Sequence, residues 1–456
     1  MTTDSGERYT ETHMATALVL IQLVIVLAMI FIGAKVGSIG LGIYGMVGVF
    51  ILVFIFGLPP GKIPMDVMLI IVSVITAAAA LQAAGGLDYM VGVAARFLRR
   101  HPQHITFYGP LTTWLFCVLA GTAHTSYSLL PIISEIATRS KIRPERPLSV
   151  STISASLGIT CSPVSAAMAA IISTDLLGGL GVELKDVLIV ARPSSLVAIL
   201  VASFVQSFVG KPLEEDPEYL RRVKEGLFDP SELGKVPSEE KNVNPRAKWS
   251  VLAFLLGVFL VVLFGSFPRL RPSFGGVALS MTETIEIVMM SMAAVILLVG
   301  KADIKKAVGG NVFAAGMNAL VSIFGIAWMG DTFFSGNMAF FQEHISGVVS
   351  RYPFLFAIAL FIMSIMLFSQ AADVRTMYPL GIALGIPPMA LVAMFPAVNG
   401  YFFFPNYPTE VAAINFDRTG TTKVGKYVIN HSFQLSGFIT TIVSIAVGYL
   451  IVGLLY

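Results

Sequence analysis

The sequence of 456 residues predicts an all-α polytopic membrane protein made of two inverted repeats, with about ten transmembrane helices and two re-entrant hairpins. Its composition is the first indication, because 55% of the residues are hydrophobic and only 12% are Asp, Glu, Lys or Arg, against about 25% in soluble domains. The second is a set of uncharged runs that are apolar on every face, which favours helices over β-barrel strands. Each is long enough for the roughly 20-residue helix that crosses a bilayer. They occupy residues 15–34, 39–61, 249–267 and 433–456.

Internal similarity predicts the repeats. In each half a small polar pair is followed by a proline ten residues after its first member, and the two patterns are offset by 248 residues. The matching positions are Gly121-Thr122 with Pro131, and Ser369-Gln370 with Pro379. Matches of this kind in constant order indicate a duplicated unit. The predicted domains are a disordered tail at 1–14, a first inverted repeat at 15–209, a cytoplasmic linker at 210–248 and a second inverted repeat at 249–456.

The positive-inside rule gives the two halves opposite orientations. The first half is predicted to hold spans at 15–34, 39–58 and 65–88, a hairpin at 105–134, a span broken near Ser162 at 148–175 and a span at 187–209. The second half is predicted to hold spans at 249–267, 282–300 and 311–332, a hairpin at 353–388, a broken span at 389–413 and a last helix at 433–456. This arrangement places most Lys and Arg residues inside and both termini outside.

Motifs of soluble enzymes and metalloproteins do not fit their context here. Gly40, Gly42 and Gly45 spell a dinucleotide-binding pattern, but they lie in an apolar helix with no preceding strand, so we interpret them as helix-packing residues. Cys117 and Cys161 lie in apolar runs and indicate neither a disulfide framework nor a zinc site. The net charge of +3 does not favour nucleic acid. We therefore expect no enzymatic activity, no cofactor and no metal.

Polar side chains gather at the breaks of the predicted spans, which are the two hairpin tips and the two broken helices. A helix N-terminus presents free N–H groups and the positive end of the helix dipole, so half-helices that begin at these breaks predict a site for a carboxylate. The alternative is that Ser and Thr only cap the breaks and bridge helices. The predicted substrate-binding residues are Thr122, His124, Ser126, Ser162, Ser165, Ser369, Gln370, Asp373, Arg375, Asn399, Tyr407 and Thr409.

Three of these residues are ionisable at membrane depth, where such groups are rare and usually functional. Arg375 has the fork that binds a substrate carboxylate, but it could equally pair with Asp373 and serve only the fold. His124 is either a proton carrier or carboxylate donor, or a satisfied core residue. The sequence leaves both interpretations open for each residue.

Several longer strings carry a family resemblance. They are residues 59–67, 81–88, 142–147, 327–331, 369–372 and 407–433. From about residue 18 to its end, the sequence resembles the bacterial anaerobic C4-dicarboxylate transporters, the Dcu family. The departures lie at the hairpin tips, where His124 follows a single Gly and Asp373-Val374-Arg375 stands where the family commonly has apolar or small residues, with a Lys in some members at the Arg375 position. They therefore concern substrate preference.

The resemblance implies antiport of fumarate, succinate, malate and aspartate across the bacterial inner membrane, in support of anaerobic respiration. It also implies a homodimer in the lipid bilayer, while the positive-inside topology gives a multi-pass protein with periplasmic termini and the net charge indicates no nucleic acid partner. Two rivals stay open. One is a cation- or proton-coupled anion permease or ion antiporter of the same fold, in which Asp373 and His124 carry the ion. The other is a sensor that holds a regulatory partner at the cytoplasmic segments 210–248 or 415–428.

Overall fold

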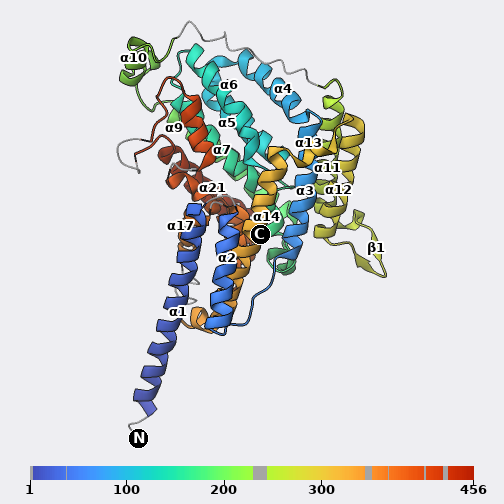
Figure 1. Cartoon of the computed structure of the whole chain (residues 1–456), viewed down its shortest axis with the longest axis vertical. Coiled ribbons are helices and arrows are strands. Elements are labelled where there is room, and N and C mark those ends of the chain that lie inside the picture. The colour runs from blue at the N-terminus through green and yellow to red at the C-terminus, as the bar shows by residue number, and fades with distance from the viewer. Residues whose placement is uncertain are drawn as a thin grey trace.

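The computed structural model describes residues 4–36, 39–229, 244–344, 352–367, 369–404, 407–424 and 430–456 (Figure 1). Helices make up nearly all of the regular structure. The only sheet in these ranges is an antiparallel pair of two-residue strands, β1 (Ser273–Phe274) and β2 (Val277–Ala278). The protein is therefore α-helical, as the apolar runs predict, with one short ribbon that they do not predict.

The first half contains the shorter helices around the predicted breaks. Its helices are α1 (Asp4–Val36), α2 (Gly40–Phe50), α3 (Met65–Ala83), α4 (Gly86–Arg100), α5 (Ile105–Ala120), α6 (Ser126–Arg139), α7 (Glu145–Thr160), α8 (Ala166–Ile171) and α9 (Leu184–Gln206). A π-helix, Ile51–Ile55, continues α2, and a 3-10 turn, Ala123–Thr125, separates α5 from α6. The predicted hairpin at 105–134 is thus an α5–α6 pair, and the predicted broken span at 148–175 is the α7–α8 pair.

The second half is joined to the first through α10 (Pro217–Lys224), while residues 230–243 of the predicted linker lie outside the described ranges. Its helices are α11 (Ala247–Ser266), α12 (Met281–Gly300), α13 (Ile304–Val308), α14 (Asn311–Gly336), α15 (Met338–His344), α17 (Phe354–Leu367), α18 (Gln370–Ala383), α19 (Pro388–Met394), α20 (Pro408–Phe416) and α21 (Gln434–Leu455). A 3-10 stretch, Phe395–Phe403, follows α19. The predicted hairpin at 353–388 is the α17–α18 pair.

Two boundaries differ from the expectation. Helix α1 begins at Asp4, so the segment expected to be a disordered tail is helical from residue 4 onward. Extending an existing helix requires no new nucleation, so a long apolar helix can continue into a polar segment. The span predicted at 65–88 ends at Ala83, because Gly85 adopts the left-handed conformation with φ 74° and turns the chain into the separate helix α4.

Seven helices in the described ranges are long and apolar enough to cross a membrane. An eighth crossing results if the pair Pro388–Phe403 and Pro408–Phe416, bent by 55°, is one broken span. Two shorter apolar helices, Gly40–Ile55 and Phe354–Leu367, add to this set. The chain is therefore a multi-pass membrane protein, while ten crossings and the inverted repeat stay predictions.

Glycines bring α2 and α14 into backbone contact. A Cβ at Gly42 would lie 2.1 Å from the carbonyl oxygen of Val321, and one at Gly325 would lie 1.9 Å from that of Gly42. At Gly45 the nearest atom, the carbonyl carbon of Gly325, would be 2.5 Å away. No larger side chain fits at these three positions without moving a helix. The structure thus confirms that Gly42 and Gly45 of the discounted dinucleotide pattern are helix-packing residues.

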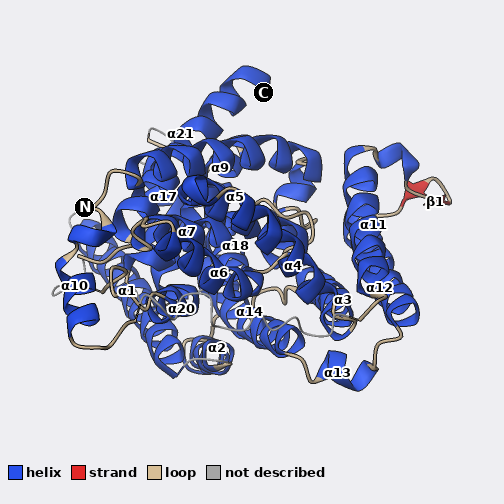
Figure 2. Ribbon diagram, turned by 90° about the horizontal axis from the view of Figure 1, so that it is seen from above, coloured by secondary structure: helices blue, strands red, loops and turns tan. Residues whose placement is uncertain are grey.

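The helices form two groups when the molecule is seen from above. Helices α11 and α12 pack beside α3 at one side, whereas α5, α7, α9 and α21 pack together, with α9 also contacting α11 (Figure 2). Helix α14 contacts α2, α3 and α18. The N-terminus and α10 lie at opposite ends of the molecule (Figure 1). The hairpin tips and broken helices meet in the interior between these two ends.

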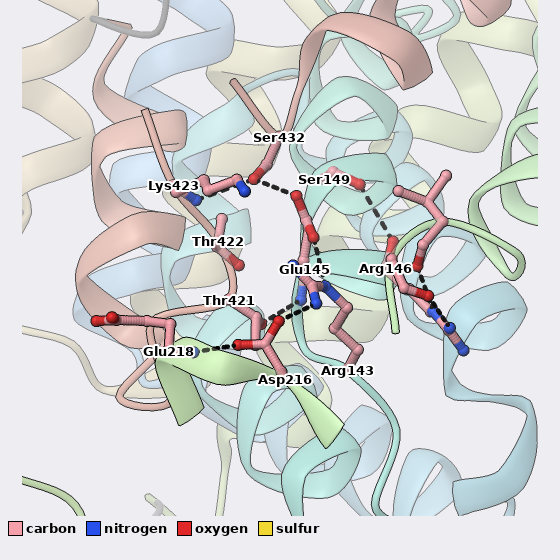
Figure 3. A network of polar contacts seen from close by, with 12 residues as sticks. Arg143, Glu145, Arg146, Ser149, Asp216, Glu218, Thr421, Thr422, Lys423 and Ser432 are labelled. Carbon is pink, nitrogen blue, oxygen red and sulfur yellow. Dashed lines mark hydrogen bonds and ion pairs between the residues drawn. The ribbon is translucent and has the colours of Figure 1, made fainter. Parts of the chain in front are cut away.

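A buried polar network near α10 joins three distant parts of the chain (Figure 3). We call it the linker clamp and define it as Arg143, Glu145, Asp216, Thr421 and Ser432. Arg143 donates hydrogen bonds to Glu145, at 2.5 Å, and to Asp216. The backbone N–H of Glu145 donates to the Thr421 hydroxyl at 3.2 Å, and Ser432 donates to the Glu145 carboxylate at 2.6 Å. Buried charges require such partners, so the clamp ties the linker to the loops before α7 and before α21.

Candidate functional site

A central cavity of about 500 Å³ lies where the breaks of the helices meet. Four segments line it at these breaks: residues 121–124 at the first hairpin tip, 164 and 166–167 at the start of α8, 369–371 at the start of α18, and 407–408 before α20. Helices α3 and α14 complete the wall, and none of the described lining residues is Asp, Glu, Lys or Arg. Small-molecule sites typically measure about 300–1,000 Å³, so the cavity is large enough for a small organic ion.

The first tip depends on a glycine. Gly121 ends α5 in the left-handed conformation with φ 69°, and a Cβ there would lie 2.8 Å from the carbonyl oxygen of Val164. Thr122 then caps the 3-10 turn, because its hydroxyl accepts a hydrogen bond from the His124 backbone N–H at 3.3 Å and lies 3.0 Å from the His124 Nδ1. Thr122 and His124 both line the central cavity. Ser126 instead donates to the Ala123 carbonyl at 2.7 Å and is fully buried.

Helices α8 and α18 begin with the same capping arrangement. The Ser165 hydroxyl accepts from the Met168 N–H at 3.0 Å, and the Ser369 hydroxyl accepts from the Ala372 N–H at 3.3 Å. The two N–H groups between each serine and its partner have no acceptor within the helix. These belong to Ala166 and Ala167 in α8, and to Gln370 and Ala371 in α18, and all four residues line the central cavity. The cavity is therefore lined by the N-terminal ends of two helices, where the helix dipole is positive.

The remaining predicted residues around the breaks serve partly as supports. Gln370 donates through Nε2 to the Asn399 Oδ1 at 2.7 Å and to the Ser156 carbonyl at 3.0 Å, which fixes the second tip against α7 and the 3-10 stretch. Ser162 accepts from the Val164 N–H at 3.3 Å and caps the break after α7. Tyr407 lines the cavity, and its ring stacks on that of Tyr401 at 4.7 Å. Thr409 is buried in the first turn of α20.

Arg375 lies outside the central cavity and lines a second cavity of about 470 Å³. Its partner is Asp175, which follows α8, and the two nitrogens of the Arg375 fork lie 2.7 and 2.8 Å from the two Asp175 oxygens. Ser173 accepts a further bond from Arg375 at 3.2 Å. The second cavity also includes Lys62 and Asp66. An ion pair between Arg375 and Asp373 is one of the alternatives that the sequence leaves open. In the structure the partner of Arg375 is Asp175 instead.

Asp373 is fully buried on α18, and neither of its carboxylate oxygens has a hydrogen-bond partner among the residues that the structure describes. The buried tyrosines Tyr378 and Tyr401 are its titratable neighbours. Asp373 does not line either cavity. It therefore lies behind the tip, apart from those predicted substrate-binding residues that line the central cavity.

Sequence reasoning missed five polar residues of the two cavities, two of which are Lys62 and Asp66 in the second cavity. Asn318 and Ser322 line the central cavity from α14, and Asp175 lines the second cavity. Asn318 and Ser322 are four residues apart in an apolar helix, which places them on one face, so this spacing was a usable signal. Asp175 stands in no motif, and its pairing with a residue 200 positions away becomes visible only in the fold.

A cavity between the ends of interrupted helices in a multi-pass membrane protein is typical of membrane transporters. Residues 18–456 match the family described as anaerobic C4-dicarboxylate membrane transporters, DcuA_DcuB, and the chain belongs to this family. This confirms the resemblance predicted from the sequence. Its relatives are named as transporters and not as enzymes, in agreement with the expectation from the motifs.

Two relatives illustrate the extent of the match. The anaerobic C4-dicarboxylate transporter DcuB of Escherichia coli O157:H7 is 40% identical over 436 residues, which cover 94% of this chain and 97% of that protein. The C4-dicarboxylate transporter DcuA of Helicobacter pylori is 38% identical over 441 residues, covering 95% and 98%. Among solved structures, the Alcanivorax borkumensis YdaH transporter aligns with a TM-score of 0.48 and 16% identity over 97% of this chain and 99% of that chain.

Proposed function

We propose that the chain exchanges C4-dicarboxylates, such as fumarate, succinate, malate and aspartate, across the bacterial inner membrane by antiport. The observation that carries the proposal is the central cavity, which has no fixed charge among its described lining residues but is lined by the first residues of α8 and α18, whose N–H groups have no acceptor within the helix. One substrate carboxylate would accept from the N–H groups of Gln370 and Ala371, and the other from Thr122 and His124. The family and the names of its relatives support this substrate class.

An uncharged cavity suits obligatory exchange. A doubly charged substrate loses its hydration in the cavity and is stabilised there by helix dipoles and N–H groups. When the site is empty, those donors face the cavity without a ligand, so a conformational change that seals them away from water is unfavourable. The loaded carrier would then reorient more readily than the empty one, and transport in one direction would require a substrate for the return.

The membrane orientation forms part of this proposal. Lys and Arg at the end of α4, in the loop after α6 and around α10 all lie at the end of the molecule opposite the N-terminus (Figure 1). The positive-inside rule then places the linker clamp on the cytoplasmic side and the loop between α2 and α3 on the periplasmic side. The second cavity, which includes Lys62 of that loop, would face the periplasm.

Counterflow in proteoliposomes tests the proposal. Vesicles loaded with succinate are expected to take up labelled fumarate and aspartate, whereas empty vesicles are not. Thr122→Val is expected to lower this uptake, and Thr76→Val is the matched control, because Thr76 donates to the Val72 carbonyl and does not line the cavity. Absence of counterflow with every C4 acid, in protein shown to be folded, would overturn the antiport proposal.

Asp373 favours a second candidate, a cation- or proton-coupled permease of the same fold. A buried carboxyl without a partner among the described residues is a group that a proton or a cation neutralises. For this candidate, uptake into empty vesicles would depend on a sodium or pH gradient, and Asp373→Asn would abolish that dependence. Uptake that needs internal dicarboxylate and ignores both gradients would exclude it.

A further inference from the structure

The two cavities are neighbours along the same pair of helices. Helix α3 contributes Asp66 to the second cavity and Ile70 to the central one, and α18 contributes Arg375 to the second and Ala371 to the central one. In both helices these residues are four positions apart, which is about one helical turn or roughly 5–6 Å. A layer only one turn thick therefore separates the second cavity from the proposed substrate site.

Arg375 is the side chain at this boundary. It is 5% exposed, and its fork is held by the two oxygens of Asp175 at 2.7 and 2.8 Å, the geometry in which a guanidinium binds any carboxylate. Its Nε is buried and has no hydrogen-bond partner among the described residues, so the guanidinium keeps an unused donor. The arrangement is a carboxylate-binding site whose occupant is a side chain of the protein itself.

Asp175 is the more exposed member of this pair. Its side chain is 32% exposed, in contrast to that of Arg375, so it reaches solvent without crossing the core. The adjacent Thr174 is also exposed and donates to Asp66 at 3.1 Å, which anchors the loop independently of Asp175. A rotation of the Asp175 side chain would therefore free the Arg375 fork without unfolding the loop that carries it.

We propose that the second cavity is an outer binding site for the dicarboxylate, in which a substrate carboxylate replaces Asp175 on Arg375. The substrate's other carboxylate would meet the ammonium group of Lys62, which lines the same cavity. Exchange of one carboxylate for another keeps the buried guanidinium neutralised throughout, so no bare charge is exposed to the apolar interior. This inference rests on the proposed function and adds an access step before the central cavity.

The distinguishing test is Asp175→Asn, because it removes the competitor and keeps the shape. If Asp175 occupies the fork for about nine-tenths of the time, its removal raises the apparent affinity for succinate about tenfold. We therefore expect the KM for succinate counterflow to fall about tenfold in Asp175→Asn and to rise in both Lys62→Gln and Arg375→Gln. If the Arg375–Asp175 pair only supports the fold, the KM of Asp175→Asn should be unchanged or raised.

Controls separate the possible failures. Glu218→Gln is the matched carboxylate control, because Glu218 pairs with Arg221 and Arg222 on α10, away from both cavities, and their hydrogen bonds lower its pKa to about 2. It is expected to leave the KM unchanged. Thermal unfolding of each variant in detergent shows that it is folded. Wild-type counterflow with an unchanged KM in Asp175→Asn would overturn the outer site alone, whereas absence of wild-type counterflow would overturn the proposed function itself.

Discussion

The two hairpins share a plan but differ in charge. Each has an ascending helix, a tip at the central cavity and a returning helix with an internal proline, Pro131 in α6 and Pro379 in α18. At the 248-residue offset found in the sequence, Asp373 corresponds to Thr125 and Arg375 to Tyr127. The first returning helix is thus uncharged at these two positions, and the second carries both signs. Both tips therefore line the same cavity, whereas the residues that follow each tip differ in charge between the two hairpins.

The largest expected difference concerns Arg375 and Tyr127. Arg375→Gln leaves Asp175 without its charged partner, so we expect the free energy of unfolding to fall by about 2 kcal/mol. This is less than the loss of a fully buried pair would cost, because Asp175 is partly exposed. Tyr127→Phe in the first hairpin keeps the contact between its ring and that of His124 and is expected to change little. Thermal unfolding in detergent measures both. Equal losses would show that the charge asymmetry does not matter to stability.

The tips themselves differ in how the chain turns. Gly121→Ala is expected to cost about 1–3 kcal/mol, because a side chain is strained at positive φ and its Cβ would press on the carbonyl of Val164. Gly181→Ala is the matched control, since Gly181 also has positive φ, at 87°, but a Cβ added there would have no other atom within 4 Å. The difference in unfolding temperature between the variants isolates the contact. If the unfolding temperatures of both variants fall equally, the positive φ of Gly121, and not its close contact with Val164, explains why glycine is needed at the first tip.

The second tip depends on a side-chain cap. Ser369→Ala removes the acceptor for the Ala372 N–H and is expected to cost about 1 kcal/mol. Ser369→Gly is expected to cost only a few tenths of that, because glycine lets water and backbone satisfy the helix start. Denaturant or thermal unfolding of the pair measures the cap. A larger loss for glycine than for alanine would contradict the capping role.

The smallest effect is expected at Asp373. A buried carboxyl with no partner in the described ranges is costly when charged, so we expect it to be neutral and Asp373→Asn to change stability by less than about 1 kcal/mol. Unfolding measurements with and without sodium test this expectation. A large loss that appears only in the presence of sodium would mean that the carboxylate is ionised and holds a cation.

The sequence predicted the helical membrane fold and the breaks that separate α5 from α6 and α17 from α18, because long apolar runs and helix interruptions are local signals. That these two pairs are re-entrant hairpins stays a prediction. It did not predict that Arg375 faces Asp175, since the two residues are 200 positions apart and neither lies in a motif. It also grouped Asp373 with Arg375, although two residues that are two positions apart on a helix do not share a face. Local patterns therefore located the breaks, while tertiary packing decided which side chains face which cavity.

The linker clamp has a consequence for biogenesis. Arg143, Glu145 and Asp216 belong to the first half and its linker, but Glu145 receives its remaining partners from Thr421 and Ser432. A ribosome that has made only the first half leaves the Glu145 carboxylate without the Ser432 hydroxyl, so this end of the protein cannot close during early insertion. The clamp is completed only after Ser432 has been synthesised, and the closing of this face therefore depends on the loop between α20 and α21.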